Sequence, residues 1–168
     1  MSEIDEKIQK LLTLHLGNIK VGISQRMTAL GRNASGSSVA SLDVNVSGNN
    51  GILFGGKQWE TMQHGRGPGK VPSNFREVIK NWVRAKGINI KPKGKQTQEQ
   101  AIESFSYLVT RNIMQKGTKL YRYKGYNDIY DTLLKEEIEK LSDDISTVFE
   151  SEVNSINDKY INDDNKID

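Results

Sequence analysis

The sequence contains no cysteine at any of its 168 positions. This absence excludes disulfide bonds, thiol nucleophiles and metal sites built on thiolates. A chain of this length folds without disulfides, so the absence fits a reducing cytosol. Histidine is scarce, with only His15 and His64, and no carboxylates stand at ligand spacing. The sequence therefore predicts neither a metal site nor a bound cofactor.

Long apolar runs are also missing. The longest spans only a few residues, well below the roughly 18 that are needed to cross a bilayer. The first residues, Met-Ser-Glu-Ile-Asp-Glu-Lys, are acidic and polar, which is the opposite of a signal peptide. We therefore expect an intracellular protein or part of a soluble assembly, with no membrane partner.

Composition and length favour one domain with a modest core. Hydrophobic residues make up 35% of the chain and charged residues 27%. A chain of this length is too short for two full-sized domains. We predict a single α+β domain over residues 1–156. Residues 157–168 are too polar to fold alone, and we expect an acidic tail there that is disordered or ordered only by a neighbour.

Charge is strongly segregated along the chain, although the net charge is only +3. Residues 57–124 carry 15 basic and 4 acidic side chains, and residues 125–168 carry 4 basic and 13 acidic ones. This pattern indicates internal electrostatic pairing or head-to-tail contact between identical subunits. A basic surface beside a separate, solvated acidic helix is the alternative, and the sequence leaves the choice open.

Hydrophobic spacing predicts the elements of the first half. Apolar residues three, four and seven apart predict one long helix over residues 3–30, with Ser2 as its N-cap and Gly31 as its C-cap. Alternation over residues 39–46, followed by a glycine-asparagine turn, predicts a β-hairpin over 39–56. Residues 57–64 fit either a short helix or a continuation of the strand.

Three further helices are predicted, joined by basic loops that contain glycine. They cover residues 74–86, 97–116 and about 127–156, and the last one is long and acidic. Ser73 is the expected cap of the first, and Thr97 with Gln100 forms a capping box for the second. The spacing of apolar residues in 74–86 places one face inward. That face comprises Phe75, Val78, Ile79, Trp82 and Val83.

No group of residues in the sequence predicts catalysis. The segment Gly65–Lys70 has three residues before Gly69-Lys70 where a phosphate-binding loop has four, Val71 where that loop has Ser or Thr, and a proline that removes a backbone donor. The loop serines lack a nucleophile-elbow pattern. The acidic pairs Glu136/Glu137 and Asp143/Asp144 of the last helix fit a solvated polar face, and each histidine is expected to be a surface or rim residue. We therefore predict no catalytic residues and no enzyme.

Two basic loops, 65–72 and 88–96, are suited to contacting phosphates without reading a base sequence. No predicted helix has a basic recognition face, so dedicated DNA binding is the alternative function rather than the leading one. The candidate interface or DNA-facing residues in and near these loops are all cationic. They are Arg66, Lys70, Arg84, Lys86, Lys91, Lys93, Lys95 and Arg122.

Several short blocks follow one another in a specific order over roughly residues 57–135. The blocks are Trp59, His64-Gly-Arg-Gly-Pro-Gly-Lys-Val-Pro72, Ile79-Lys-Asn-Trp-Val-Arg-Ala-Lys-Gly-Ile88, Ala101, Arg111-Asn-Ile113, Lys116-Gly-Thr118, Tyr121-Arg122 and Asp128-Ile-Tyr130. Their order resembles neck and tail-completion proteins of tailed double-stranded DNA phages. The resemblance has one departure nearby, because Ser35-Gly36 stands where the family usually has Thr-Gly.

This resemblance implies a structural subunit of the virion neck, made in the host cytoplasm, with no catalytic residues to carry over. The expected partners are other copies in a ring of six or twelve, together with portal-side and tail-side phage proteins. Contact with genomic DNA in the channel is a further expectation. Under this hypothesis, the basic middle of one subunit meets the acidic helix of the next.

Overall fold

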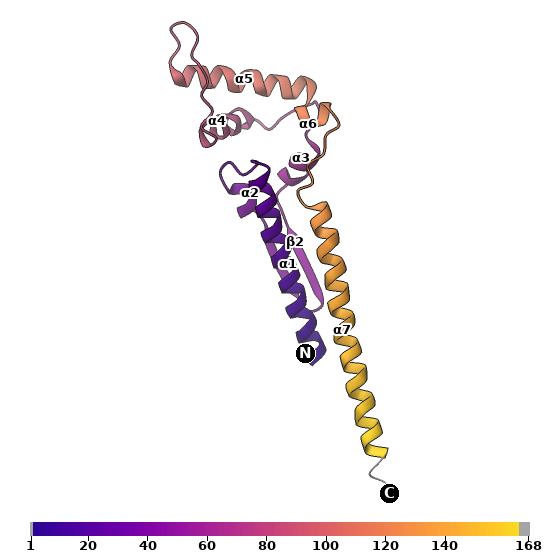
Figure 1. Cartoon of the computed structure of the whole chain (residues 1–168). Helices are drawn as coiled ribbons and strands as arrows, with labels where there is room; N and C mark the ends of the chain where they lie inside the picture. Colours follow the sequence, from indigo (N-terminus) through magenta and orange to yellow (C-terminus); the bar gives the residue numbers. More distant parts are fainter. Residues whose placement is uncertain (1, 165–168) are drawn as a thin grey trace. The chain divides into compact units, whose positions relative to one another are not determined.

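The computed structural model describes residues 2–164, and its fold is α+β, as the sequence predicted (Figure 1). The chain divides into two compact units. Unit 1 is formed from Met1–Arg26, Leu42–Phe54 and Tyr130–Asp168, and unit 2 from Met27–Ser41 and Gly55–Ile129. The single domain predicted over residues 1–156 stays a prediction. In the described part of the chain, no helix is long and apolar enough to span a membrane.

Unit 1 contains two long helices and a hairpin. Helix α1 covers Glu3–Ala29, strands β1 and β2 cover Asp43–Ser47 and Asn50–Phe54, and helix α7 covers Asp131–Asp164. The strands pair antiparallel, with Asp43 opposite Phe54 and Ser47 opposite Asn50. A two-residue connection of this kind gives a tight hairpin.

The predicted ends of α1 are confirmed. The Ser2 hydroxyl accepts a hydrogen bond from the Asp5 N–H at 3.1 Å, and the Ser2 N–H donates to the Asp5 carboxylate at 3.0 Å. This reciprocal pair satisfies donors that the first turn of a helix leaves free. After the helix, Gly31 adopts a left-handed φ of +61°, and the Arg32 N–H donates to the Met27 carbonyl at 2.8 Å.

The core of unit 1 lies along one face of α1, where Ile8, Leu12, Ile19 and Ile23 are buried. The hairpin and α7 both approach this helix closely. A Cβ added at Gly51 of β2 would lie 2.7 Å from the Leu16 side chain. A Cβ added at Gly22 of α1 would lie 2.6 Å from Leu133 of α7, so both glycines permit close packing. Figure 1 shows α1 and α7 running side by side.

The predicted hairpin was too long at its beginning. Residues Ser37–Ala40 form a short helix, α2, and β1 begins only at Asp43. The preceding Gly36 has a left-handed φ of +76°, and its N–H donates to the Asn33 side chain at 2.9 Å. The Ser41 N–H then closes the turn by donating to the Ser37 and Ser38 carbonyls. These local hydrogen bonds favour the helical turn over the strand that the alternating pattern predicted at residues 39–42. The alternation corresponds to a strand only in β1.

Unit 2 is built on four helices besides α2. They are α3 (Gln58–His64), α4 (Phe75–Ala85), α5 (Gln98–Lys116) and α6 (Lys119–Arg122). Residues 57–64 therefore follow the helical alternative, and α4 packs against α5.

Of the two caps predicted in unit 2, one is confirmed and one is wrong. Thr97 accepts from the Gln100 N–H at 3.3 Å, and the Gln100 side chain accepts from the Thr97 N–H at 2.9 Å, which completes the capping box. The N-cap of α4 is Asn74 rather than Ser73, and it makes no side-chain capping bond. A polar residue beside a helix start does not by itself fix which residue leaves the helical conformation.

Helix α7 begins later and ends later than predicted. Residues 127–129 are held by α3 instead, because the Asn127 N–H donates to the Gln63 carbonyl at 2.9 Å and its side-chain amide donates to the Met62 carbonyl at 2.8 Å. At the other end, the helix continues past residue 156 to Asp164, through a segment without glycine or proline. Residues 165–168 of the predicted tail lie outside the described residues.

Candidate interaction surfaces

The glycine-rich loop Gly65–Lys70 is tied to the segment that follows α5. The Arg66 N–H donates to the Thr118 hydroxyl at 2.9 Å, and the Thr118 N–H donates to the Arg66 carbonyl at 2.8 Å. The Gly69 N–H donates to the Met114 carbonyl at 2.8 Å. A phosphate-binding loop needs its backbone N–H groups directed at the ligand. Here those donors are used within the protein, so the loop has a structural role.

The glycines of this region permit a close approach of two backbones. Gly65 and Gly117 have left-handed φ values of +81° and +74°. A Cβ at Gly117 would lie 2.6 Å from the Arg66 carbonyl oxygen, and one at Gly65 would lie 2.5 Å from the Tyr121 nitrogen. Two of the sequence blocks that carry the phage resemblance therefore pack against each other in unit 2.

Three of the eight candidate cations are engaged within unit 2. The Arg66 guanidinium donates to the Lys70 carbonyl at 2.6 Å. Arg84 forms an ion pair with Glu99, and the Lys86 ammonium donates to the Gly31 carbonyl. These side chains stabilise the unit locally, which leaves them less suited to an external ligand than the sequence predicted.

The other five candidates are exposed, and none has a carboxylate within ion-pair distance among the side chains of residues 2–161. They are Lys70, Lys91, Lys93, Lys95 and Arg122. Lys91, Lys93 and Lys95 share the loop between α4 and α5, where Gly94 adopts a φ of +60° and the Gln96 N–H donates to the Lys93 carbonyl. Three lysines without carboxylate partners among residues 2–161 give this loop a local positive charge.

Further cations that sequence reasoning did not single out form a network between α4 and α5. Arg76 pairs with Glu103 at 3.2 Å, and Lys80 pairs with both Glu77 and Glu103. The hydrogen bond from Lys80 is the main reason that the pKa of Glu103 is lowered, and the same bond raises the pKa of Lys80. Arg76 and Lys80 are four residues apart, which places both on one face of α4. This spacing was the signal in the sequence that could have indicated the network.

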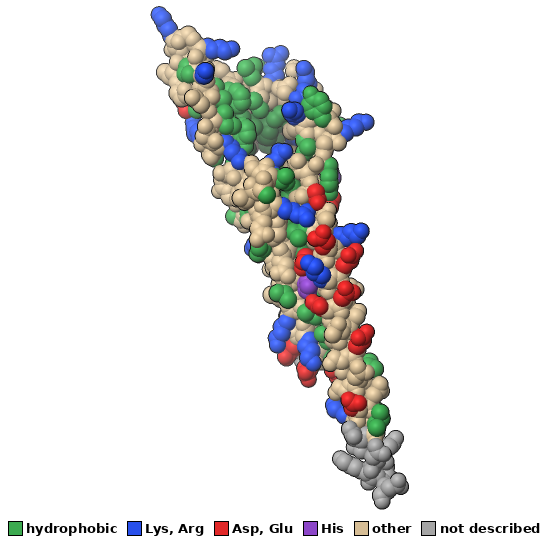
Figure 2. Space-filling view, viewed as in Figure 1, with side chains coloured by type: hydrophobic (Ala, Val, Ile, Leu, Met, Phe, Trp, Pro, Cys, Tyr) green, Lys and Arg blue, Asp and Glu red, His purple; other side chains and the backbone are tan. Residues whose placement is uncertain are grey.

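The two units carry opposite charge. Unit 1 contains 16 acidic and 8 basic residues, whereas unit 2 contains 16 basic and 5 acidic residues. Figure 2 shows acidic side chains gathered along α7 of unit 1. The charges that are segregated along the sequence therefore also lie in different compact units. The net charge of each unit is much larger in magnitude than that of the whole chain.

Helix α4 leaves apolar side chains exposed that the sequence placed in the core. Of the five residues predicted to face inward, only Val83 is buried, whereas Val78 and Trp82 are 48% and 43% exposed. Leu108 of α5 is exposed as well. Periodicity identifies residues that share a face, but α5 covers only part of that face.

The exposed face of α4 borders a groove of about 610 Å³ in unit 2, named the Trp82 groove below. Its walls come from the loop after α1 and from α2, α3 and α4. The lining includes Arg32, Met62, Val78, Asn81, Trp82 and Ala85, together with residues 33–38. None of its described lining residues is acidic, so the groove combines an apolar surface with positive charge.

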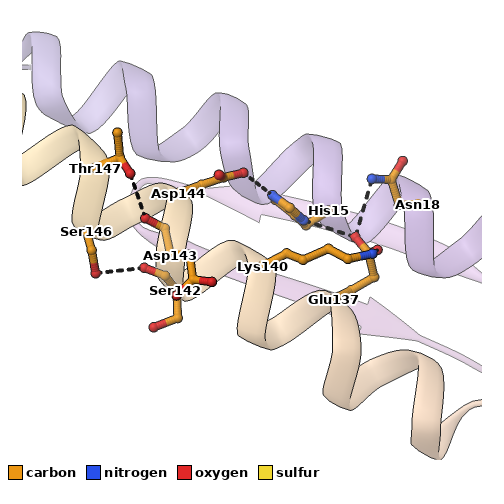
Figure 3. A network of polar contacts seen from close by, with 9 residues as sticks. All are labelled: His15, Asn18, Glu137, Lys140, Ser142, Asp143, Asp144, Ser146 and Thr147. Carbon is orange, nitrogen blue, oxygen red and sulfur yellow. Dashed lines mark hydrogen bonds and ion pairs between the residues drawn. The ribbon is translucent and has the colours of Figure 1, made fainter.

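His15 is buried, contrary to the expectation that both histidines lie at the surface (Figure 3). Its Nδ1 lies 3.0 Å from the Glu137 carboxylate, and its Nε2 lies 2.9 Å from that of Asp144. The sequence signal was its position in α1, because Leu12, His15 and Ile19 follow the helical spacing of the buried face. Glu137 and Asp144 were expected on a solvated face and instead hold this ring.

Glu137 is buried and receives hydrogen bonds from three side chains. Lys140 approaches at 2.6 Å, His15 at 3.0 Å and Asn18 at 3.4 Å. The bond from Lys140 is the largest cause of the lowered pKa of Glu137, and those from His15 and Asn18 add to it. Because both ring nitrogens of His15 contact carboxylates, neither is available to a substrate. The network therefore fixes α1 to α7 rather than forming a reaction centre.

The described side chains, those of residues 2–161, include no group of three or more His, Asp or Glu placed to hold a metal ion. A scan against protein-family models, a search of curated proteins and a search of solved structures each found no match. The features available for a functional proposal are therefore the exposed lysine loop, the Trp82 groove and the opposite charges of the two units.

Proposed function

We propose that this protein is a structural subunit of the neck of a tailed double-stranded DNA phage, where its copies form a ring between portal-side and tail-side proteins. The observation that carries the proposal is the opposite charge of the two compact units, with a net charge of −8 on unit 1 and +11 on unit 2. The order of sequence blocks over residues 57–135 supplies the link to the phage neck.

Opposite units on identical chains favour heterologous contacts. The acidic unit of one copy attracts the basic unit of the next, whereas two like units repel each other. A repeated heterologous contact generates a ring whenever its rotation closes. We therefore propose a ring of six or twelve copies in the virion neck, after synthesis in the host cytoplasm.

The local anatomy supports a scaffold rather than an enzyme. The Gly65–Lys70 loop uses its backbone donors internally, and His15 has both ring nitrogens in contact with carboxylates. The exposed lysine loop then provides a site for the acidic surface of a neighbouring ring or for DNA in the channel.

The experiment that tests this function changes Lys91, Lys93 and Lys95 together to Glu. All three are exposed, so the free energy of unfolding should change by no more than about 0.5 kcal/mol. In a phage that depends on the variant, we expect DNA-filled heads that fail to join tails or that leak their genome. The matched control changes the same residues to Arg, which keeps the charge and should give normal particles.

A nonspecific DNA-binding protein is the second candidate, favoured by three exposed lysines without carboxylate partners in the described chain. In that case the wild type binds duplex DNA with an affinity that falls steeply with salt. The triple Glu variant should then reduce the slope of log K against log salt by about three. Tight, salt-dependent binding together with normal particles from this variant would reject the neck proposal.

A further inference from the structure

The second half of α7 has a row of large apolar side chains without cover in the described structure. Their spacing of four, three and four residues places them on one face of the helix. Their exposed fractions range from 44% to 71%. They are Phe149, Val153, Ile156 and Tyr160, named the α7 stripe below.

We infer that the α7 stripe of one copy packs into the Trp82 groove of a second copy, an inference that rests on the proposed ring and identifies its contact surfaces. Both surfaces are exposed, and each presents a row of apolar side chains along one helix, α7 in the stripe and α4 in the groove. In the groove, Val78, Trp82 and Ala85 repeat the spacing of four and three along α4. An amphipathic helix that lays such a row into an apolar groove is a recurrent mode of recognition.

Charge favours the Trp82 groove of a second copy, rather than the α7 stripe of that copy, as the partner of the α7 stripe. Helix α7 carries 11 acidic and 3 basic residues, so two such helices side by side repel each other. The groove lies in the unit with a net charge of +11, and Arg32 forms part of its lining. Glu150 and Glu152 flank the stripe on opposite sides, where they would meet these positive charges.

The absence of cysteine makes this contact measurable by disulfide trapping, because no native thiol competes. One chain carries Ile156→Cys in the stripe, and a second chain with a size tag carries Ala85→Cys in the groove. Both positions are exposed, and a disulfide forms only when the two Cα atoms come within about 7 Å. After mixing and mild oxidation, we expect the mixed dimer as the main product.

The matched control places the cysteine at Ser151, which is exposed on the same helix but points away from the stripe. We expect the mixed dimer to form at least about tenfold faster with Ile156→Cys than with Ser151→Cys, because docking raises the local thiol concentration. Adding Val153→Asp to the Ile156→Cys chain should return the rate to that of the control. Circular dichroism melts confirm that each variant is folded.

Equal rates at residues 151 and 156 would overturn the inference, and so would a predominant disulfide between two Ile156→Cys chains. Because trapping uses purified protein, it is independent of the neck role. Trapping that succeeds while Val153→Asp phage assemble normally would leave the contact standing and reject the neck function. If trapping fails while phage with Lys91, Lys93 and Lys95 changed to Glu are defective, the contact is rejected and the neck function stands.

Discussion

His15 is a polar residue at a position whose spacing belongs to the apolar face of α1. It is tolerated there because both ring nitrogens have carboxylate partners, and an unpartnered polar group at that depth is costly. The nearby Lys140 and Asn18 hold Glu137 from other directions.

The first prediction compares the two histidines of the chain. His15→Ala should lower the free energy of unfolding by about 2–3 kcal/mol, because it removes a donor to buried Glu137 and leaves a cavity. His64→Ala is the control: the side chain is exposed, and the loss should be no more than about 0.5 kcal/mol. Urea denaturation measures both. Equal losses would contradict a structural role for the His15 network.

The second prediction concerns acid stability. The pKa of Glu137 in the folded protein lies below its ordinary value of 4.5, so ionised Glu137 stabilises the fold above that value. This stabilisation should disappear as the pH falls through the lowered pKa. The difference in melting temperature between wild type and Glu137→Gln should therefore be full at pH 7 and should shrink below about pH 4.5. A difference that is constant from pH 7 to pH 3 would refute it.

The third prediction compares an open and a crowded glycine. Gly94 and Gly117 both have positive φ values, but a Cβ at Gly94 meets nothing within 4 Å, whereas one at Gly117 lies 2.6 Å from the Arg66 carbonyl. Gly94→Ala should cost about 1 kcal/mol, from conformation alone. Gly117→Ala should cost at least about 1 kcal/mol more, because its φ of 74° and ψ of 179° are open essentially to glycine alone and because backbone must move. Thermal melts test this, and equal costs would show that the loop is free to shift.

At the scale of the element, α7 has two faces with different surroundings. One face holds Glu137 and Leu133 against α1, and the other is the exposed α7 stripe. A helix that stabilised its own unit alone would need only the first face. The proposed contact between copies would cover the second face.

The fourth prediction concerns the end of this helix. Tyr160 and Ile161 are 71% and 60% exposed, so deletion of residues 157–168 removes little buried apolar surface from the described side chains of this segment, residues 157–161. The melting temperature of the dilute protein should remain within about 2 °C of the wild type. Differential scanning calorimetry gives the measurement. A loss of several degrees would mean that these side chains contribute to the core.

At the scale of the whole molecule, a net charge of +3 conceals two bodies of opposite sign. Attraction between unlike units is long-ranged in dilute salt but is screened within about 10 Å at 0.1 M ionic strength. Association of copies should therefore be electrostatic at first encounter and should become stable only with additional contacts in the particle.

The fifth prediction follows for self-association. In analytical ultracentrifugation, the isolated protein should be a monomer or a weak oligomer whose association constant falls as salt is raised. Symmetry-resolved imaging of the particle should show a ring of six or twelve copies. A stable two-fold dimer in both settings, insensitive to salt, would contradict heterologous assembly.

Much of the fold was determined by the sequence alone. The spacing in α1 and α5, the Ser2 and Thr97 caps and the left-handed Gly31 depend on contacts within a few residues, so local pattern was sufficient to predict them. The charge segregation could also be predicted from the sequence, because most acidic residues of unit 1 and most basic residues of unit 2 lie in continuous segments of the chain.

Only the tertiary structure decided which faces and side chains are covered. Trp82 and His15 both occupy helical faces with apolar spacing, yet Trp82 borders an open groove and His15 is buried against Glu137 and Asp144. The engagement of Arg84 by Glu99 was equally hidden. Periodicity defines a face from the geometry of one helix, whereas its burial depends on a partner element that is distant in sequence.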